Sequence, residues 1–96
     1  MNDASVSPAI SEVLQILKIF EVNAEYWHSG GGIFGIMVWL PDGKSLFWGA
    51  VDGVWAYDYM EADNDYISSG VTDFPEHGFA PSSLAQAIVD SVKALS

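Results

Sequence analysis

The sequence contains no cysteine and no arginine, and each absence excludes a kind of chemistry. Without cysteine there is no disulfide framework, thiolate metal ligand or thiol nucleophile, which disfavours a disulfide-stapled secreted module. Without arginine there is no guanidinium fork for bidentate recognition of phosphate. No apolar run approaches the roughly 18 residues that span a bilayer, and the polar N-terminus lacks a cationic leader region. We therefore expect a cytoplasmic protein that does not enter a membrane.

Basic residues are scarce, whereas acidic residues are abundant. The chain has 13 acidic residues against three lysines, which gives a formal net charge of −10 and a pI near 4.1. From Ser45 to Val92 there is no basic residue at all. This charge repels nucleic acid and anionic membranes and favours encounter with a basic protein or a cation. The alternative interpretation is that the acidity only keeps an apolar domain soluble.

The remaining composition fits one small globular domain. The 96 residues are 50% hydrophobic, and a domain of this size buries about two thirds of the surface of its unfolded chain. We expect residues 1–96 to form a single domain in which residues 1–6 are a frayed tail. The sequence has no internal repeat and no linker.

The run from Ile33 to Met60 predicts three consecutive antiparallel strands joined by two tight turns. Each turn contains Asp-Gly, which provides the positive φ that a tight hairpin needs. The first turn is expected to be type I followed by a left-handed Gly43. The two turns predict two pairs of facing residues: Leu40 with Lys44, and Val51 with Val54.

Alternation along these strands divides their side chains between two faces. With the register above, one face carries Phe34, Ile36, Val38, Leu40, Leu46, Trp48, Trp55, Tyr57 and Tyr59. The other face carries Ile33, Met37, Trp39, Phe47, Val51, Val54, Asp58 and Met60, with Gly35 and Gly49 between them. A shift of one residue in either turn would reshuffle these sets, but both faces would remain apolar. The pattern is typical of a sheet covered on both sides.

A helix and a short strand are expected before the meander. Ser7-Pro8 is typical of a helix start, with a capping hydroxyl followed by proline in the first turn. Apolar residues then recur at helical spacing up to about Phe20 or Glu21. The segment Ala24 to His28 is a candidate strand that leads into the glycines at 30–32.

A fourth meander strand and a second helix are expected after it. Tyr66 to Val71 predicts the strand, and residues 73–80 an irregular crossing. Ser83 to Gln86 fits a capping box at the start of the C-terminal helix. The apolar stripe of that helix is expected to pack on the sheet.

These elements predict an α+β two-layer fold: an N-terminal helix, an antiparallel meander of four to five strands and a C-terminal helix packed on the sheet. Two short helices cover one face of such a sheet but hardly two, because packed helices lie about 10 Å apart. If both lie on one face, the other leaves large apolar side chains for a second copy or a different partner to cover. The alternative is that the first helix lies on the opposite face.

No motif in the chain identifies a reaction. Gly30, Gly32 and Gly35 have the spacing G-x-G-x-x-G, but a strand follows them where a dinucleotide site needs a helix. Glu61 and Asp63 begin an alternation that resembles an EF-hand loop, but the required glycine is missing from it.

The two histidines do not indicate a catalytic or metal site either. His28 and His77 have no metal-ligand spacing with each other, and no serine lies in a nucleophile elbow. His77 is expected to face solvent. We therefore expect a protein that is not an enzyme and has no metal and no cofactor.

Three functional interpretations remain. The first is a non-catalytic interaction protein that docks a basic protein partner, as acidic inhibitors, immunity proteins and nucleic-acid mimics do by the same physics. Its predicted binding residues are Asp52, Asp58, Glu61, Asp63, Asp65 and Asp73. The alternative is a small-ligand protein with an aromatic pocket for a cation or a sugar. The predicted pocket residues are Trp48, Trp55, Tyr57 and Tyr59. The third interpretation is a structural homo-oligomer in which the same aromatic residues form the contact between subunits. It is compatible with either of the others, and we expect a homodimer.

Overall fold

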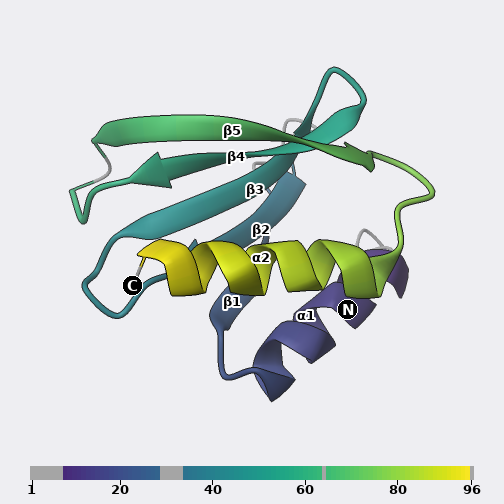
Figure 1. Ribbon diagram of the computed structural model, residues 1–96, viewed down its shortest axis with the longest axis horizontal. Coiled ribbons are helices and arrows are strands. Elements are labelled where there is room, and N and C mark those ends of the chain that lie inside the picture. Colours follow the sequence, from purple (N-terminus) through teal and green to yellow (C-terminus); the bar gives the residue numbers. More distant parts are fainter. Residues whose placement is uncertain (1–7, 29–33, 64, 96) are drawn as a thin grey trace.

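The structure is a computed structural model that describes residues 8–28, 34–63 and 65–95 (Figure 1). The expected frayed tail and the 30–32 glycines lie outside these residues. The elements are α1 (Pro8–Ile19), β1 (Asn23–His28), β2 (Phe34–Trp39), β3 (Ser45–Val51), β4 (Val54–Met60), β5 (Tyr66–Pro75) and α2 (Pro81–Leu95). The predicted α+β two-layer fold is confirmed.

The five strands form one antiparallel sheet in the order β1-β2-β3-β4-β5, which leaves β1 and β5 at its edges. The register predicted at both turns is confirmed. The Leu40 N–H donates to the Lys44 carbonyl at 2.8 Å, and Gly43 has a φ of 90°. At the second turn Val51 faces Val54, and both residues between them have a positive φ.

Helix α1 ends in a Schellman motif that directs the chain into β1. Glu21 has a φ of 61°, the Glu21 N–H donates to the Lys18 carbonyl, and the Val22 N–H donates to the Leu17 carbonyl at 2.9 Å. This pair of bonds satisfies two carbonyls of the last helical turn. The predicted end near Phe20 is therefore close to the observed one.

Two predicted boundaries differ from the structure. The second helix begins at Pro81, because the Leu84 N–H already donates to the Ala80 carbonyl at 3.0 Å. The capping box predicted at Ser83 is wrong, and Pro81 occupies the first helical position, where its missing N–H costs nothing. Strand β5 continues past Val71 to Pro75, where an irregular crossing was predicted.

The longer β5 depends on a bulge that a strand pattern does not reveal. Between the Ala56–Val71 pair and the Val54–Pro75 pair, β5 contains two more residues than β4. The Thr72 hydroxyl donates to the Trp55 carbonyl at 2.7 Å and accepts from the Phe74 N–H at 3.2 Å. These bonds satisfy backbone groups where the regular ladder is interrupted.

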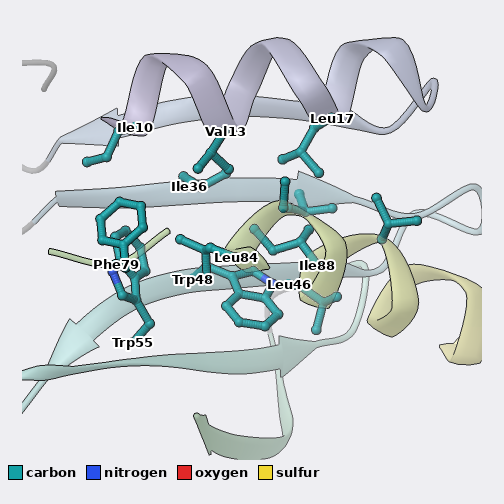
Figure 2. Close-up of a cluster of buried hydrophobic side chains, with 13 residues drawn as sticks. Ile10, Val13, Leu17, Ile36, Leu46, Trp48, Trp55, Phe79, Leu84 and Ile88 are labelled. Atoms are coloured by element: carbon teal, nitrogen blue, oxygen red, sulfur yellow. The ribbon is translucent and has the colours of Figure 1, made fainter. Parts of the chain in front are cut away.

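Both helices pack on the same face of the sheet (Figure 1). Ile10, Val13 and Leu17 of α1 point toward a cluster that also contains Ile36 of β2 and Trp48 of β3 (Figure 2). Leu84 and Ile88 of α2 join the same cluster and are fully buried. Burying each such side chain contributes about 1.5–3 kcal/mol. One core therefore fills the space between the helices and one face, and neither helix covers the opposite face.

Candidate functional site

Four acidic residues gather at one end of the sheet, on the β2–β3 turn and the β4–β5 loop. The two loops are neighbours, because a Cβ added to Gly43 would lie 3.5 Å from the Cβ of Ala62. All four acidic side chains are on exposed residues. We call them the acidic end: Asp42, Glu61, Asp63 and Asp65.

The acidic end contains one cation, Lys44. Its Nζ lies 3.6 Å from Oδ2 of Asp42. The pKa of Lys44 is raised above its ordinary value, first by the phenolic oxygen of Tyr59 and then by the carboxylates of Asp42 and Glu61. Lys44 is therefore charged at neutral pH and balances only one of the four carboxylates.

The acidic loops are held by local hydrogen bonds. Oδ1 of Asp42 accepts from the Lys44 N–H at 3.1 Å, and Oδ1 of Asp63 accepts from the Asp65 N–H at 3.2 Å. Side chains that bond to the backbone two residues ahead fix the shape of a turn. The position of these carboxylates is therefore set within each loop.

The other predicted acidic residues lie elsewhere on the sheet. Asp52 is in the β3–β4 turn, at the opposite end of β4 from the acidic end, a strand length of about 20–25 Å away. Asp73 lies near Asp52, because the Glu76 N–H donates to the Gly53 carbonyl and brings this part of the chain beside that turn. Asp58 is exposed in the middle of β4. The structure thus divides the predicted binding residues among three places and does not bring them into one patch.

The predicted aromatic pocket requires a correction. Trp48 is 1% exposed and Trp55 is 0% exposed, because both lie on the sheet face that the helices cover. The ring of Trp48 packs on Tyr57 at a centroid distance of 4.8 Å, and that of Trp55 packs edge-on against Phe79 at 5.4 Å. Neither tryptophan offers a surface to a ligand or a second chain. Tyr57 is half-buried against the same core.

Tyr59 is also half-buried, beside the core and close to Lys44. Because Trp48 and Trp55 lie in the core, Tyr57 and Tyr59 do not form an aromatic pocket with the tryptophans. The indole Nε1 atoms of both tryptophans are buried and have no hydrogen-bond partner within the part of the chain that the structure describes. A buried donor without a partner costs about 1–3 kcal/mol, and burial of the large apolar ring opposes this cost.

Two of the exposed aromatic side chains, both tryptophans, lie on the uncovered side of the sheet. Trp27 of β1 is 39% exposed and Trp39 of β2 is 36% exposed. The strand register places Met37, Phe47 and Met60 on the same side, each half-buried. Two carboxylates, Glu25 and Asp58, lie in the same cross-strand row as Met37 and Phe47. We call these residues the open face: Glu25, Trp27, Met37, Trp39, Phe47, Asp58 and Met60.

The centre of the open face is closely packed. Gly35 faces Gly49 across β2 and β3, and the Phe47 ring leans over Gly35, so that a Cβ there would lie 2.8 Å from Cζ of Phe47. The Trp27 ring meets the Phe47 ring edge-on at 5.2 Å. Aromatic side chains that cover a glycine on a neighbouring strand help to hold the register of a sheet.

A shallow groove lies between α1 and β1. Its volume is about 420 Å³, and its lining includes Leu14, Lys18, Val22 and Asn23. None of the described residues that line it is a histidine or a carboxylate.

The described residues give no support for metal ligation. Within residues 8–28, 34–63 and 65–95, no group of three His, Asp or Glu side chains lies close enough to hold a metal ion. His77 faces solvent as predicted, with 88% of its side chain exposed, and its Nε2 lies 3.7 Å from Oε2 of Glu76. The side chain of His28 lies outside the described residues.

Among the helices that the structure describes, none has the length and apolarity to cross a bilayer.

Compared with known proteins, the chain matches no protein-family model and shows no significant similarity to a curated protein or to a solved structure.

Proposed function

We propose that this protein is a non-catalytic interaction domain that docks a basic protein partner, in the manner of an acidic inhibitor, immunity protein or nucleic-acid mimic. The observation that carries the proposal is the acidic end, where four exposed carboxylates on adjacent loops are offset by Lys44 alone. Such a concentration of one sign of charge attracts a basic surface and speeds its approach.

A charge reversal at the tip of the acidic end tests the proposal. We expect Asp63→Lys with Asp65→Lys to abolish salt-sensitive capture of basic proteins from a cell extract, because two attractions become repulsions. The melting temperature should change little, because both side chains are exposed and the described bond that is lost, from the Asp65 N–H to Oδ1 of Asp63, is itself exposed. The matched control is Glu12→Lys with Asp90→Lys, which changes the net charge equally on the exposed faces of the two helices.

The two variants separate a local site from general acidity. Captured proteins are identified by mass spectrometry at low and at high salt. If the acidic-end variant, Asp63→Lys with Asp65→Lys, loses capture and the control retains it, the acidic end is supported as the binding surface. Equal capture by the native protein and the acidic-end variant contradicts the proposal.

We further propose that two copies associate through the free edge of β5. The segment Tyr66 to Thr72 is exposed or half-buried and contains no charged residue, although the chain carries a formal net charge of −10. An edge strand presents unpaired backbone groups to another chain, and like charge on both copies opposes contact elsewhere. An antiparallel β5–β5 contact would extend the sheet across a two-fold axis.

A further inference from the structure

The open face is an apolar surface of the sheet that faces away from both helices. It contains Trp27 and Trp39, which are exposed, and Met37 and Phe47 between them. Exposed apolar groups that are contiguous and rimmed by charge mark interaction sites in soluble proteins. We infer that this face docks a basic amphipathic helix of a partner protein.

The charges on the face argue against a second copy as its cover. Glu25 of β1 and Asp58 of β4 flank the apolar centre, and Lys18, Lys44 and Lys93 all lie elsewhere, in the last turns of the helices and in the β2–β3 turn. Two copies packed face to face would bring four carboxylates together without a cation. Like charges opposed at an interface cost several kcal/mol. A partner that supplies cations would instead be attracted to Glu25 and Asp58.

The dimensions of the face suit a helix. The four strands that carry the residues of the open face, β1 to β4, measure about 14 Å across and about 20 Å along, which gives a footprint of roughly 300 Å². This is less than half of the roughly 800 Å² that each partner buries in a standard interface. A helix of about 14 residues is about 21 Å long and about 10 Å wide, so one helix can lie along the centre of the face.

The position of the two carboxylates defines the chemistry of that helix. Glu25 and Asp58 lie in one row on strands that are three spacings apart, so each is about 7 Å from the line between β2 and β3. A helix along this line would place its apolar stripe on Met37, Phe47 and Trp39. Lysine or arginine side chains on both flanks of the stripe would reach Glu25 on one side and Asp58 on the other, with Trp27 available for a cation–π contact. We therefore assign cations to both flanks of the partner helix.

This inference rests on the proposed function, but it assigns the contact to a different surface. The probe is a synthetic peptide of about 14 leucine and lysine residues with one apolar stripe flanked by lysine on both sides. Two matched peptides serve as controls. One replaces lysine with glutamate, and the other has the same composition in an order without a stripe. Binding is measured by titration calorimetry at low and high salt.

Three protein variants with equal changes of net charge locate the contact. We expect Glu25→Lys with Asp58→Lys to weaken binding of the striped lysine peptide by about tenfold or more. The acidic-end variant, Asp63→Lys with Asp65→Lys, and the helix control, Glu12→Lys with Asp90→Lys, should weaken it by less than about threefold. The glutamate peptide and the unstriped peptide should bind at least about tenfold more weakly to the native protein.

Tryptophan quenching gives a second readout that does not depend on charge. Trp27 and Trp39 are exposed, whereas Trp48 and Trp55 are buried, so acrylamide quenches mainly the first pair. Binding of the striped peptide should protect them. Unchanged quenching in the presence of bound peptide would overturn the inference, as would a complete lack of binding.

The outcomes distinguish this inference from the proposed function. An equal loss in all three variants would mean general attraction between opposite charges and would overturn the assignment to the open face. A loss confined to the acidic-end variant would also overturn it, while supporting the acidic end as a binding surface. If capture from extract fails but the open-face variant alone loses the peptide, the open face stands and the acidic end does not.

Discussion

The sharpest structural prediction concerns Gly35, at the centre of the open face. A Cβ added there would meet the backbone carbonyl oxygen of Trp48 and would lie 2.8 Å from Cζ of Phe47. The Phe47 ring can turn away, but the carbonyl belongs to the neighbouring strand and cannot move without disturbing the ladder. We therefore expect Gly35→Ala to be destabilising.

The magnitude follows from two opposing effects. Overpacking of this kind costs about 1–3 kcal/mol. Replacing glycine by alanine in a conformation that alanine tolerates contributes about 0.4–1 kcal/mol of stability through the unfolded chain. The net loss should be about 1–2 kcal/mol, which for a domain of this size lowers the melting temperature by roughly 5–15 °C.

The assay is urea unfolding of Gly35→Ala followed by circular dichroism, with Gly70→Ala as the matched comparison. At Gly70 the obstructing atoms are the end of the Tyr57 ring, with Cε2 at 2.7 Å. That ring end can shift toward the exposed edge of the sheet, so we expect Gly70→Ala to cost less. A Gly35→Ala protein as stable as the native one, or less affected than Gly70→Ala, would refute the reasoning from the close backbone approach.

Two further predictions concern the core and the association of two copies. Leu17→Ala should lower the free energy of unfolding by about 2–5 kcal/mol, and Leu14→Ala by clearly less, because Leu17 is fully buried and Leu14 is half-buried. Scanning calorimetry measures both losses. Equal losses would contradict the placement of Leu17 in the core. Light scattering after size exclusion should give the mass of a dimer at both low and high salt. Val71→Lys on the β5 edge should give the mass of a monomer, because the lysines of the two copies would repel each other at the contact. A native protein that is monomeric at every concentration would contradict the homodimer.

Much of the sheet could be predicted because its determinants are local. The Asp-Gly turns fix the pairing of neighbouring strands through the backbone angles that only a few residues adopt, and both registers are confirmed. Helical spacing and the proline at position 8 likewise predicted α1 correctly. These features depend on residues a few positions apart, so they can be predicted without knowledge of the rest of the fold.

The location of the candidate site was harder to predict from the sequence. Trp48 and Trp39 lie on apolar strands of similar composition, yet one is buried and the other exposed. Their alternation shows that they face opposite sides, but both sides are apolar, so it does not say which one the helices cover. Glu25 and Trp27 join the open face through the pairing of β1 with β2, across a connection whose length and glycines left the register open.

The sequence alone determined the charge of this protein, the order of its elements and the turns that set the register of the central strands, because each depends on composition or on neighbouring residues. The tertiary structure decided which tryptophans form the core, how the acidic residues are distributed and where an apolar surface stays uncovered. Those outcomes follow from the packing of α1 and α2 on one face. Packing joins residues far apart in the chain, and two faces of equal hydrophobicity do not encode that choice locally.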